Sequence, residues 1–305
     1  MPLVSIIMNV RNGAAFLRQA LDSVFSQTFQ DWELIVWDDC STDDSASIVA
    51  EYQDTRVRYF LSPEDTPLGK ARNSAIRQAT GQWLAFLDQD DIWLPRKLEK
   101  QIALSGTNVG LIYGRAIVFY PDGSDHDYDY AHEFTPLPEG DIFTQLFTHA
   151  CFITMSSALL RRAAVEESGG IPAAIETVPD YCLYMAVAHR YEARAVQEAV
   201  CRYRMHPGGM SQTNRRKLYT EPLWLLDQWE SCLDPGIVTY RRMTYSTALA
   251  WEEMQSLRTF TDGLKRLFTQ GSLHWLLGRP FVRAWRVLRR KLCRPYWRRR
   301  QNNSH

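Results

Sequence analysis

The stretch Trp83-Leu84-Ala85-Phe86-Leu87-Asp88-Gln89-Asp90-Asp91 decides how the rest of the chain is interpreted. Its five apolar residues follow a Thr80-Gly81 turn, are too few for a helix and predict a buried strand. Three carboxylates then follow within four residues. Because neighbouring like charges repel and buried unpaired charges are costly, a hard divalent cation such as Mg²⁺ is the simplest reason for this cluster. The alternative is a solvated acidic turn that only precedes a helix starting near Pro95.

The charge of the chain is distributed unevenly along its length. The 305 residues are 45% hydrophobic and have a formal net charge of zero, which is ordinary for a globular protein. Residues 263–305 contain twelve Lys and Arg and no Asp or Glu, which leaves 23 basic against 35 acidic side chains in residues 1–262. An acidic body of net charge −12 therefore carries a basic tail of +12.

The cysteines and the apolar segments indicate the cellular compartment in which we expect the protein. The scattered cysteines form no CxxC pair and have no metal-ligand spacing, which favours a reducing cytosol over a disulfide framework. They are Cys40, Cys151, Cys182, Cys201, Cys232 and Cys293. Residues 3–8 lack the features of a signal peptide and predict a first strand. No apolar run reaches about 18 residues, so we expect no transmembrane helix and a cytoplasmic location.

Strand and helix patterns alternate through the first half of the chain. The expected strands cover residues 3–8, 33–37, 57–60 and 83–87. Ser41, three residues before Asp44, predicts a capping box for the helix after the second strand. Such βα repeats predict a mostly parallel, doubly wound sheet that binds ligands at the carboxyl ends of its strands. Two acidic clusters, Asp38-Asp39 and the one after residue 87, follow strands at that edge, which favours a binding site over a solvated turn.

The second half of the chain has a less regular pattern. The expected strands cover residues 111–120, 152–160 and 193–204. Asp180 opens a helix that runs to about His189, and a single Asp at such a place is usually only an N-cap. His206 stands beside a Gly208-Gly209 turn, where a histidine can face an anion. From Asn214 onward the pattern is helical.

Taken together and in order, these blocks resemble the family 2 glycosyltransferases over residues 3–211. The blocks are Val4-Ser5-Ile6-Ile7 with Asn12-Gly13, Trp37-Asp38-Asp39-Cys40-Ser41-Thr42-Asp43, Gly69-Lys70-Ala71-Arg72-Asn73, Phe86-Leu87-Asp88-Gln89-Asp90-Asp91, Asp180 opening a helix, and Tyr203-Arg204-Met205-His206-Pro207. The resemblance implies an α/β, A-type glycosyltransferase fold with a Rossmann-like, doubly wound mixed sheet and a C-terminal helical extension. It implies a catalytic domain over residues 1–213, with a nucleotide-binding half (1–105) and an acceptor half (106–213), and a helical region over 214–305.

The resemblance also assigns roles to residues. Asp180 would be the general base that takes a proton from the acceptor hydroxyl, a contribution of roughly 10²–10⁴-fold in rate. Asp88 and Asp90 would form the Asp-x-Asp pair that holds the ribose and the metal. Asp90 and the adjacent Asp91 would hold Mg²⁺ or Mn²⁺, which bridges the diphosphate of the donor. The donor-binding residues would be Asn12, Asp38, Asp39, Arg72, Asp88, Asp90 and His206. A single displacement would invert the anomeric configuration, so no covalent sugar–enzyme intermediate is expected.

Three positions depart from the family pattern. Arg11 stands where the family commonly has Tyr, and a guanidinium plane could take over stacking on the base, although a uracil preference then has less support. Cys40 replaces the usual Gly or Asn. Pro179 precedes the proposed base where the family often has an acidic residue, which removes a neighbouring charge.

The basic tail combines an apolar aromatic stripe with a cationic face. Phe281, Trp285, Leu288 and Leu292 share one helical stripe, and Arg283, Arg286, Arg290 and Arg294 occupy another side. This composition is typical of a helix that lies on an anionic membrane surface, here over residues 279–300. The alternatives are a helix packed on the catalytic domain and, without any recognisable nucleic-acid module, a nucleic-acid contact.

Two classes of function follow from these observations. The first is a metal-assisted glycosyltransferase that uses a nucleotide sugar, with UDP-sugar expected, and acts on a glycan or lipid-linked saccharide in cell-surface polysaccharide synthesis. The second is a catalytically silent protein of the same fold that binds sugar or scaffolds a glycan-assembly complex at the membrane. The retained Asp39, Asp88, Asp90 and Asp180 favour the enzyme. A Rossmann dehydrogenase is excluded because no GxGxxG follows the first strand, and a sugar nucleotidyltransferase lacks its Gly-rich loop here.

Overall fold

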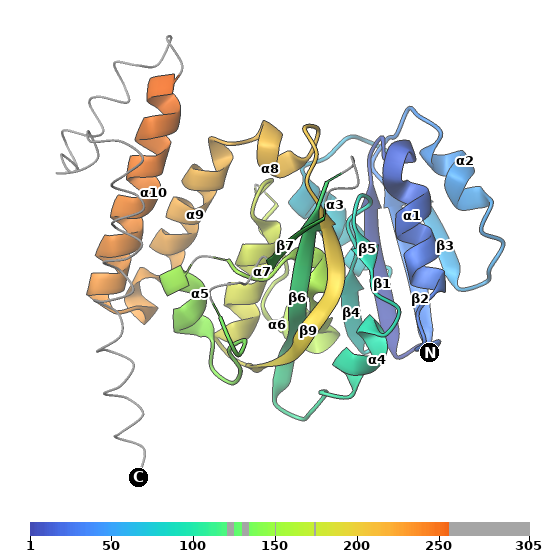
Figure 1. Ribbon diagram of the computed structural model, residues 1–305, viewed down its shortest axis with the longest axis horizontal. Helices are drawn as coiled ribbons and strands as arrows, with labels where there is room; N and C mark the ends of the chain where they lie inside the picture. The colour runs from blue at the N-terminus through green and yellow to red at the C-terminus, as the bar shows by residue number, and fades with distance from the viewer. Residues whose placement is uncertain (121–124, 130–133, 150, 174, 256–305) are drawn as a thin grey trace. The chain divides into compact units, whose positions relative to one another are not determined.

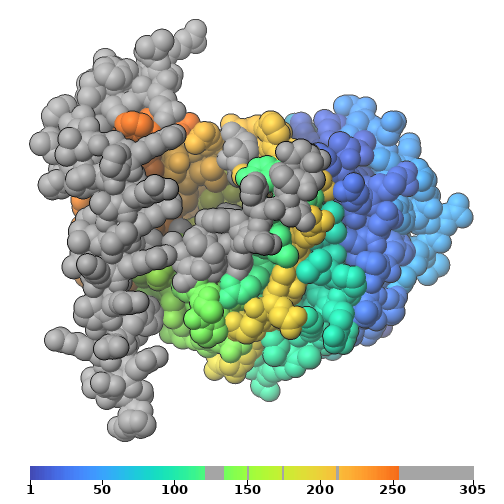
Figure 2. Space-filling view, in the orientation of Figure 1, coloured from blue at the N-terminus to red at the C-terminus, as the bar shows by residue number. Residues whose placement is uncertain are grey.

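A mixed sheet runs through the first compact unit of the chain, Met1–Ile237 (Figure 1). The computed structural model describes residues 1–120, 125–129, 134–149, 151–173 and 175–255. Within these ranges nine strands join in the order β3-β2-β1-β4-β8-β6-β9-β5, with β7 paired to β6. Figure 2 shows the N-terminal segments, in blue, gathered on one side of this unit, with the later segments, in green and yellow, beside them.

The first half of the chain supplies the parallel part of the sheet. Its elements are β1 Val4–Val10, α1 Ala14–Phe25, β2 Trp32–Asp38, α2 Ser45–Ala50, β3 Val57–Leu61, α3 Leu68–Ile76 and β4 Trp83–Phe86. β1 pairs in parallel with both β2 and β4, and β2 pairs in parallel with β3. The predicted doubly wound arrangement is thus confirmed. Because the strands run the same way, the segments after Val10, Asp38 and Phe86 meet at one edge of the sheet.

The second half adds strands in both directions, as a mixed sheet requires. Its elements are β5 Ile92–Trp93, α4 Lys97–Ile102, β6 Val109–Phe119, β7 Asp125–Asp129, α5 Phe143–His149, η1 Met155–Ser157, β8 Leu159–Arg161, α6 Arg162–Glu167, α7 Pro179–Ala188 and β9 Glu192–Arg204. β8 lies antiparallel between β4 and β6, and β6 pairs in parallel with β9. This pairing brings the end of β9 toward the segment that follows β4.

The strand predicted over residues 152–160 is mostly wrong. A 3₁₀ turn, η1, occupies residues 155–157, and β8 covers only Leu159–Arg161. The backbone of this segment is bonded to side chains instead of to a neighbouring strand: the carbonyl of Ser156 accepts from the Trp93 indole at 2.8 Å, and that of Ser157 accepts from Gln101 at 2.8 Å. β5 was also missed, because two residues carry no detectable strand pattern.

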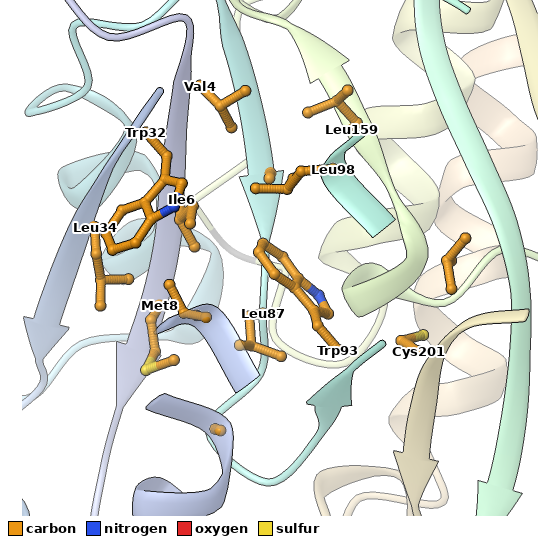
Figure 3. Packing of buried hydrophobic residues seen from close by; sticks show 14 of the residues in the cluster. Val4, Ile6, Met8, Trp32, Leu34, Leu87, Trp93, Leu98, Leu159 and Cys201 are labelled. Atoms are coloured by element: carbon orange, nitrogen blue, oxygen red, sulfur yellow. The ribbon is translucent and has the colours of Figure 1, made fainter. Parts of the chain in front are cut away.

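The acidic stretch is held between buried apolar residues. Leu87, directly before it, and Trp93, shortly after it, are each 1% exposed. Both belong to a core cluster that also contains Val4, Ile6, Met8, Trp32, Leu34 and Leu98 (Figure 3). The alternating β1 residues of this cluster share one face of the strand. Burial on both sides of the carboxylates therefore fixes the path of the backbone between them.

The capping box predicted from Ser41 is wrong. The N-cap of α2 is Asp44, which makes no side-chain capping bond within the described part of the chain. Asp43 takes this role, because its Oδ1 accepts from the backbone N–H of Ser45 at 3.0 Å. The Ser41 hydroxyl instead accepts the backbone N–H of Asn12 at 2.9 Å, so it joins the loops after β1 and β2.

The chain after β9 is helical as far as it is described. The elements are α8 Met210–Thr213, α9 Lys217–Trp229, η2 Glu230–Cys232 and α10 Pro235–Gln255, and the second compact unit begins at Val238. No helix among residues 1–255 that the structure describes has both the length and the apolar character needed to cross a membrane. Cys40, Cys151, Cys182, Cys201 and Cys232 are free thiols. The tail predicted to bind membranes, residues 279–300, and Cys293 lie outside the described residues.

Candidate active site

Asn12 ties together the loops that follow β1 and β2. Its Oδ1 accepts the backbone N–H of Thr42 at 2.8 Å, and its own N–H donates to the Ser41 hydroxyl. Asn12 and Cys40 both adopt the left-handed conformation, with φ of 49° and 60°, which lets each loop turn sharply at the strand end. Asn12 therefore lies beside the acidic cluster of β2, with its amide oxygen bonded to that loop.

Asp38, at the end of β2, is a buried residue that shapes this loop. It is 1% exposed, and its two oxygens accept the Tyr59 hydroxyl at 2.7 Å and the backbone N–H of Ser41 at 2.7 Å. Both bonds are local to the β2–β3 edge of the sheet. The side chain of Asp38 thus supports the neighbouring residue, Asp39, and is itself largely shielded.

Asp39 faces a loop that contains Thr66 and a cation. Its carboxylate accepts the Thr66 hydroxyl at 3.2 Å and the Thr66 backbone N–H at 3.3 Å. Arg11 lies 3.7 Å away and also pairs with Asp65 on the same loop. Half of the Arg11 side chain is exposed, so its guanidinium plane is available at the rim of this site. The residue that replaces the family's usual Tyr is therefore next to Asp39.

Arg72 and Asp88 form an ion pair at the carboxyl end of β4. Nη2 of Arg72 lies 2.5 Å from Oδ1 of Asp88, and the Arg72 side chain is 6% exposed against 33% for Asp88. The Asp88 backbone N–H donates to the Ser156 hydroxyl at 3.1 Å. A buried guanidinium thus points to the edge of the sheet, where it is paired with the Asp88 carboxylate.

Asp90 is bound from the end of β9. Nε2 of His206 lies 2.9 Å from Oδ2 of Asp90, and the Arg204 guanidinium donates to the Asp90 carbonyl at 2.7 Å. Burial and the nearby Asp88 charge raise the pKa of Asp90, and the His206 hydrogen bond opposes this rise. Charge is therefore unfavourable at Asp90 unless a positive group approaches it.

Asp91 is internal, unlike the two carboxylates before it. It is 1% exposed, and its oxygens accept the Ser156 hydroxyl at 2.5 Å and the Arg204 backbone N–H at 2.9 Å. Burial and the charges of Asp90 and Asp88 raise its pKa well above the usual range. Asp91 therefore links the end of β9 and the 155–157 turn to the acidic stretch through hydrogen bonds in the protein interior.

Asp180 lies in the first turn of α7, after the N-cap residue Val178. The alternative, in which Asp180 is only the N-cap, therefore does not hold, because Val178 occupies that position. Its Oδ1 accepts the adjacent Tyr181 N–H at 2.8 Å, and burial raises its pKa to about 6. The positive charge of Arg72 lowers this pKa and the negative charge of Asp88 raises it, so both members of the ion pair at the end of β4 act electrostatically on Asp180.

Three residues that support the site were not singled out from the sequence. Gln89 exchanges hydrogen bonds with the backbone of Arg11, at 2.9 and 3.1 Å, and so joins the β4 and β1 loops. Arg204 and Ser156 hold the acidic stretch as described above. Gln89 and Arg204 stand inside the quoted motif blocks, which is a sequence signal for a role at the site. Ser156 has no local sequence signal.

The donor set at the sheet edge suits a hard divalent cation. The described residues contain no group of three or more His, Cys, Asp and Glu side chains arranged as a complete metal site. Mg²⁺ usually binds through one or two carboxylates together with substrate phosphates and water, so a partial protein set is the ordinary case. The partly exposed carboxylates of Asp88 and Asp90 provide such a set, and carboxylate oxygens suit both Mg²⁺ and Mn²⁺. His206 lies beside Asp90.

Comparison with known sequences agrees with these features. A family model described as glycosyl transferase family 2 matches residues 5–169. The chain is 40% identical over 113 residues to the Escherichia coli UDP-Glc:alpha-D-GlcNAc-diphosphoundecaprenol beta-1,3-glucosyltransferase WfgD. The aligned region covers 37% of this chain and 45% of WfgD. It is 29% identical over 220 residues to E. coli WfaP, a protein with the same description, and this aligned region covers 72% of this chain and 83% of WfaP. The chain thus spans less than half the length of WfgD.

Comparison with solved structures identifies the fold. TarS from S. aureus in complex with UDP-GlcNAc has a TM-score of 0.58 at 18% identity, over 87% of this chain and 72% of that one. The mannosyltransferase PcManGT from Pyrobaculum calidifontis, in complex with GDP-Man and Mn²⁺, has a TM-score of 0.61 at 20% identity, over 94% and 84%. At these identities the likeness concerns the fold alone. The predicted A-type glycosyltransferase fold is confirmed.

Proposed function

Because the chain belongs to glycosyl transferase family 2, we propose that it transfers a sugar from a UDP-sugar to a hydroxyl of a lipid-linked saccharide, with inversion at the anomeric carbon. One observation carries this proposal: helix α3 contacts both the acidic edge of β4 and the segment that leads to Asp180. Arg72 of this helix pairs with Asp88, and the Gly69 N–H donates to the Ile175 carbonyl at 3.3 Å. A donor site and a proton acceptor next to each other are what a single displacement requires.

The donor would lie along the edge formed by the ends of β1, β2 and β4. Asp39 would bind the nucleobase beside Asn12 and Asp38, and Arg11 would cover the base with its guanidinium plane. Arg72 would turn from Asp88 to an oxygen of the ribose or diphosphate, which suits the forked guanidinium.

The metal site we propose differs from the pair Asp90 and Asp91 expected from the sequence. Asp90 and Asp88 would be the carboxylate ligands, with His206 beside them, because both oxygens of Asp91 are already bonded inside the protein. When bound, Mg²⁺ or Mn²⁺ would neutralise charge on the leaving nucleoside diphosphate. Asp91 would support its neighbours through Ser156 and Arg204.

Asp180 would accept the proton of the attacking hydroxyl. With a pKa of about 6 it is mostly ionised at neutral pH, yet basic enough to take a proton as the new bond forms. The positive charge of Arg72 lowers the pKa of Asp180 and so favours the ionised carboxylate that a base requires.

The acceptor and the location are proposed from the relatives and from the tail. WfgD and WfaP are named for a GlcNAc-diphosphoundecaprenol acceptor, which is bound to a membrane. We propose an acceptor of this class, reached from the cytoplasmic face, where residues 279–300 would hold the enzyme at anionic lipid.

The test is transfer of radiolabelled glucose from UDP-glucose to a synthetic GlcNAc-diphospholipid with Mg²⁺ or Mn²⁺. We expect a product whose new linkage has the configuration opposite to that of the donor, and no product with excess EDTA. A panel of other UDP-sugars is run in parallel. If no donor is turned over while UDP still binds, the alternative of a catalytically silent binding protein replaces the proposal.

A further inference from the structure

A buried carboxylate from α9 binds the backbone that leads into α7. The two oxygens of Glu221 accept three consecutive backbone N–H groups, those of Glu176 at 3.1 Å, Thr177 at 2.8 Å and Val178 at 3.0 Å. Glu221 is 8% exposed. Hydrogen bonds to a carboxylate are roughly twice as strong as those between neutral groups, so this is a strong attachment between segments 43 to 45 positions apart.

It is the segment leading into α7 that depends on this outside acceptor, whereas within the helix the Tyr181 N–H donates to Asp180 Oδ1. The first N–H groups of a helix have no partner within the helix and are usually capped by the side chain of the N-cap residue. Here the N-cap is Val178, whose side chain has no acceptor, and Pro179 at the first helical position has no N–H. Among the described residues, Glu221 is what satisfies the N–H groups of the segment just before the helix.

Asp180 follows directly on this anchored segment. It lies two residues after Val178, in the first turn of α7, and its pKa reflects its closeness to Arg72 and Asp88. The backbone has few freely rotating bonds between the anchored N–H of Val178 and Asp180, because the ring of Pro179 fixes one of them. Movement of the anchor would therefore be transmitted to the Asp180 carboxylate.

We infer that Glu221 is a positioning residue for Asp180: its carboxylate fixes the entry of α7 so that the base stands at the donor edge of the sheet. This inference rests on the proposed function, since it gives Asp180 a catalytic position to hold. It also assigns a part in the reaction to α9, which lies beyond the residues 5–169 that the family model matches.

A second contact on the same segment provides the control. Lys217, one turn before Glu221 on α9, pairs with the side chain of Glu176. Both side chains are more than one third exposed, and such pairs contribute roughly 0–1 kcal/mol. Lys217→Met therefore removes a contact between the same two segments and leaves the three backbone bonds in place.

The experiment compares Glu221→Gln with Lys217→Met in the full chain. Glutamine keeps the size of the side chain but loses its charge, and its NH₂ group faces N–H donors. We expect faster hydrogen–deuterium exchange over residues 176–182 and a kcat for transfer from UDP-glucose to GlcNAc-diphospholipid that falls by about 10- to 100-fold, as for a misplacement of about 1 Å. KM for UDP-glucose should stay unchanged, and Lys217→Met should match the wild type in all three readouts.

Non-additivity with Asp180 separates positioning from general stability. If Glu221 acts through Asp180, Glu221→Gln should cause no further loss of kcat in an Asp180→Asn background. A full additional loss there, or a loss in the single variant that equals its unfolded fraction by circular dichroism, would overturn the inference. If Asp180→Asn itself keeps the wild-type rate, the proposed function fails, whatever Glu221→Gln does.

Discussion

His206 Nε2 lies 2.9 Å from Asp90 Oδ2, although 116 positions separate the two residues in the chain. The contact brings the end of β9 to the acidic segment after β4, and the Arg204 bond to the Asp90 carbonyl reinforces it. The Phe86–Asp91 block and the last block of the family 2 motif set thus meet at one point. A donor diphosphate bound there would contact both halves of the sheet.

Asp90→Asn should separate stability from activity. Burial and the Asp88 charge raise the pKa of Asp90 above its value in the unfolded chain. Asp90 therefore lowers the free energy of unfolding of the protein once the pH exceeds the pKa of this group in the unfolded chain. At pH 7.5 without metal, Asp90→Asn should therefore melt at or above the wild-type temperature. Its transfer rate should fall by at least about 100-fold, because charge stabilisation by a positioned group is worth several kcal/mol. A Tm well below that of the wild type would contradict this account.

Asp91 should respond to substitution as an internal support. Asp91→Ala leaves the Ser156 hydroxyl and the Arg204 N–H without their acceptor inside the protein, which should cost about 2–4 kcal/mol. Asp91→Asn keeps an acceptor and removes a buried charge, so it should cost clearly less. Urea unfolding of the two variants measures this difference, and equal losses would argue against the role.

Lys97 should give the protein a rise in stability at alkaline pH. It is 1% exposed, bonded to Gln101 at 2.6 Å, and burial lowers its pKa from 10.5 to about 7. Between these values the unfolded chain binds the proton and the folded chain does not, so the free energy of unfolding increases as the pH rises from about 7 toward 10.5. Lys97→Met should flatten this rise in urea melts at pH 7.5 and 9.5.

The control for Lys97 is the more exposed Lys100, which pairs with Glu198. Lys100→Met should keep the alkaline rise. Because buried thiols also titrate in this pH range once the chain unfolds, the comparison of variants decides: a pH dependence that is the same in Lys97→Met as in the wild type would contradict the role of Lys97.

Deleting residues 279–305 should release the protein from anionic liposomes. Each basic residue near such a surface contributes about 1 kcal/mol, and the attraction weakens as salt rises. Transfer to a membrane-embedded acceptor should fall, while transfer to a short, water-soluble analogue should be spared. Binding of the full chain that is unaffected by salt or by lipid charge would contradict this expectation.

Much of the parallel half of the fold could be predicted because buried strands there are apolar along their whole length and polar residues follow directly where they end. The run at residues 83–87 is apolar since both faces of a central parallel strand are covered, and the carboxylates after it mark the strand end. For the same reason Asp38 and Asp88 could be placed at one edge before any contact was known.

The remaining features depend on contacts that leave no local pattern. Residues 155–157 turn because Asp91, Trp93 and Gln101 take their polar groups, and these partners are more than 50 positions away. The three carboxylates look alike in sequence, yet burial separates Asp91 from Asp88 and Asp90. Glu221 is one of many glutamates until the fold brings it to the start of α7.

We propose that Asp180 acts as the base beside a bound donor, and a comparison of Asp180→Asn with the wild type tests this role. Calorimetry gives the Kd for UDP with Mg²⁺, and the transfer assay gives kcat across pH 5–9. The wild-type kcat should rise with pH around 6, where Asp180 loses its proton, and then level off. Asp180→Asn should bind UDP with an unchanged Kd, lose transfer by about 10²–10⁴-fold on the plateau above pH 7, and show no rise around pH 6. A variant that transfers at the wild-type rate with the same pH profile would contradict the account.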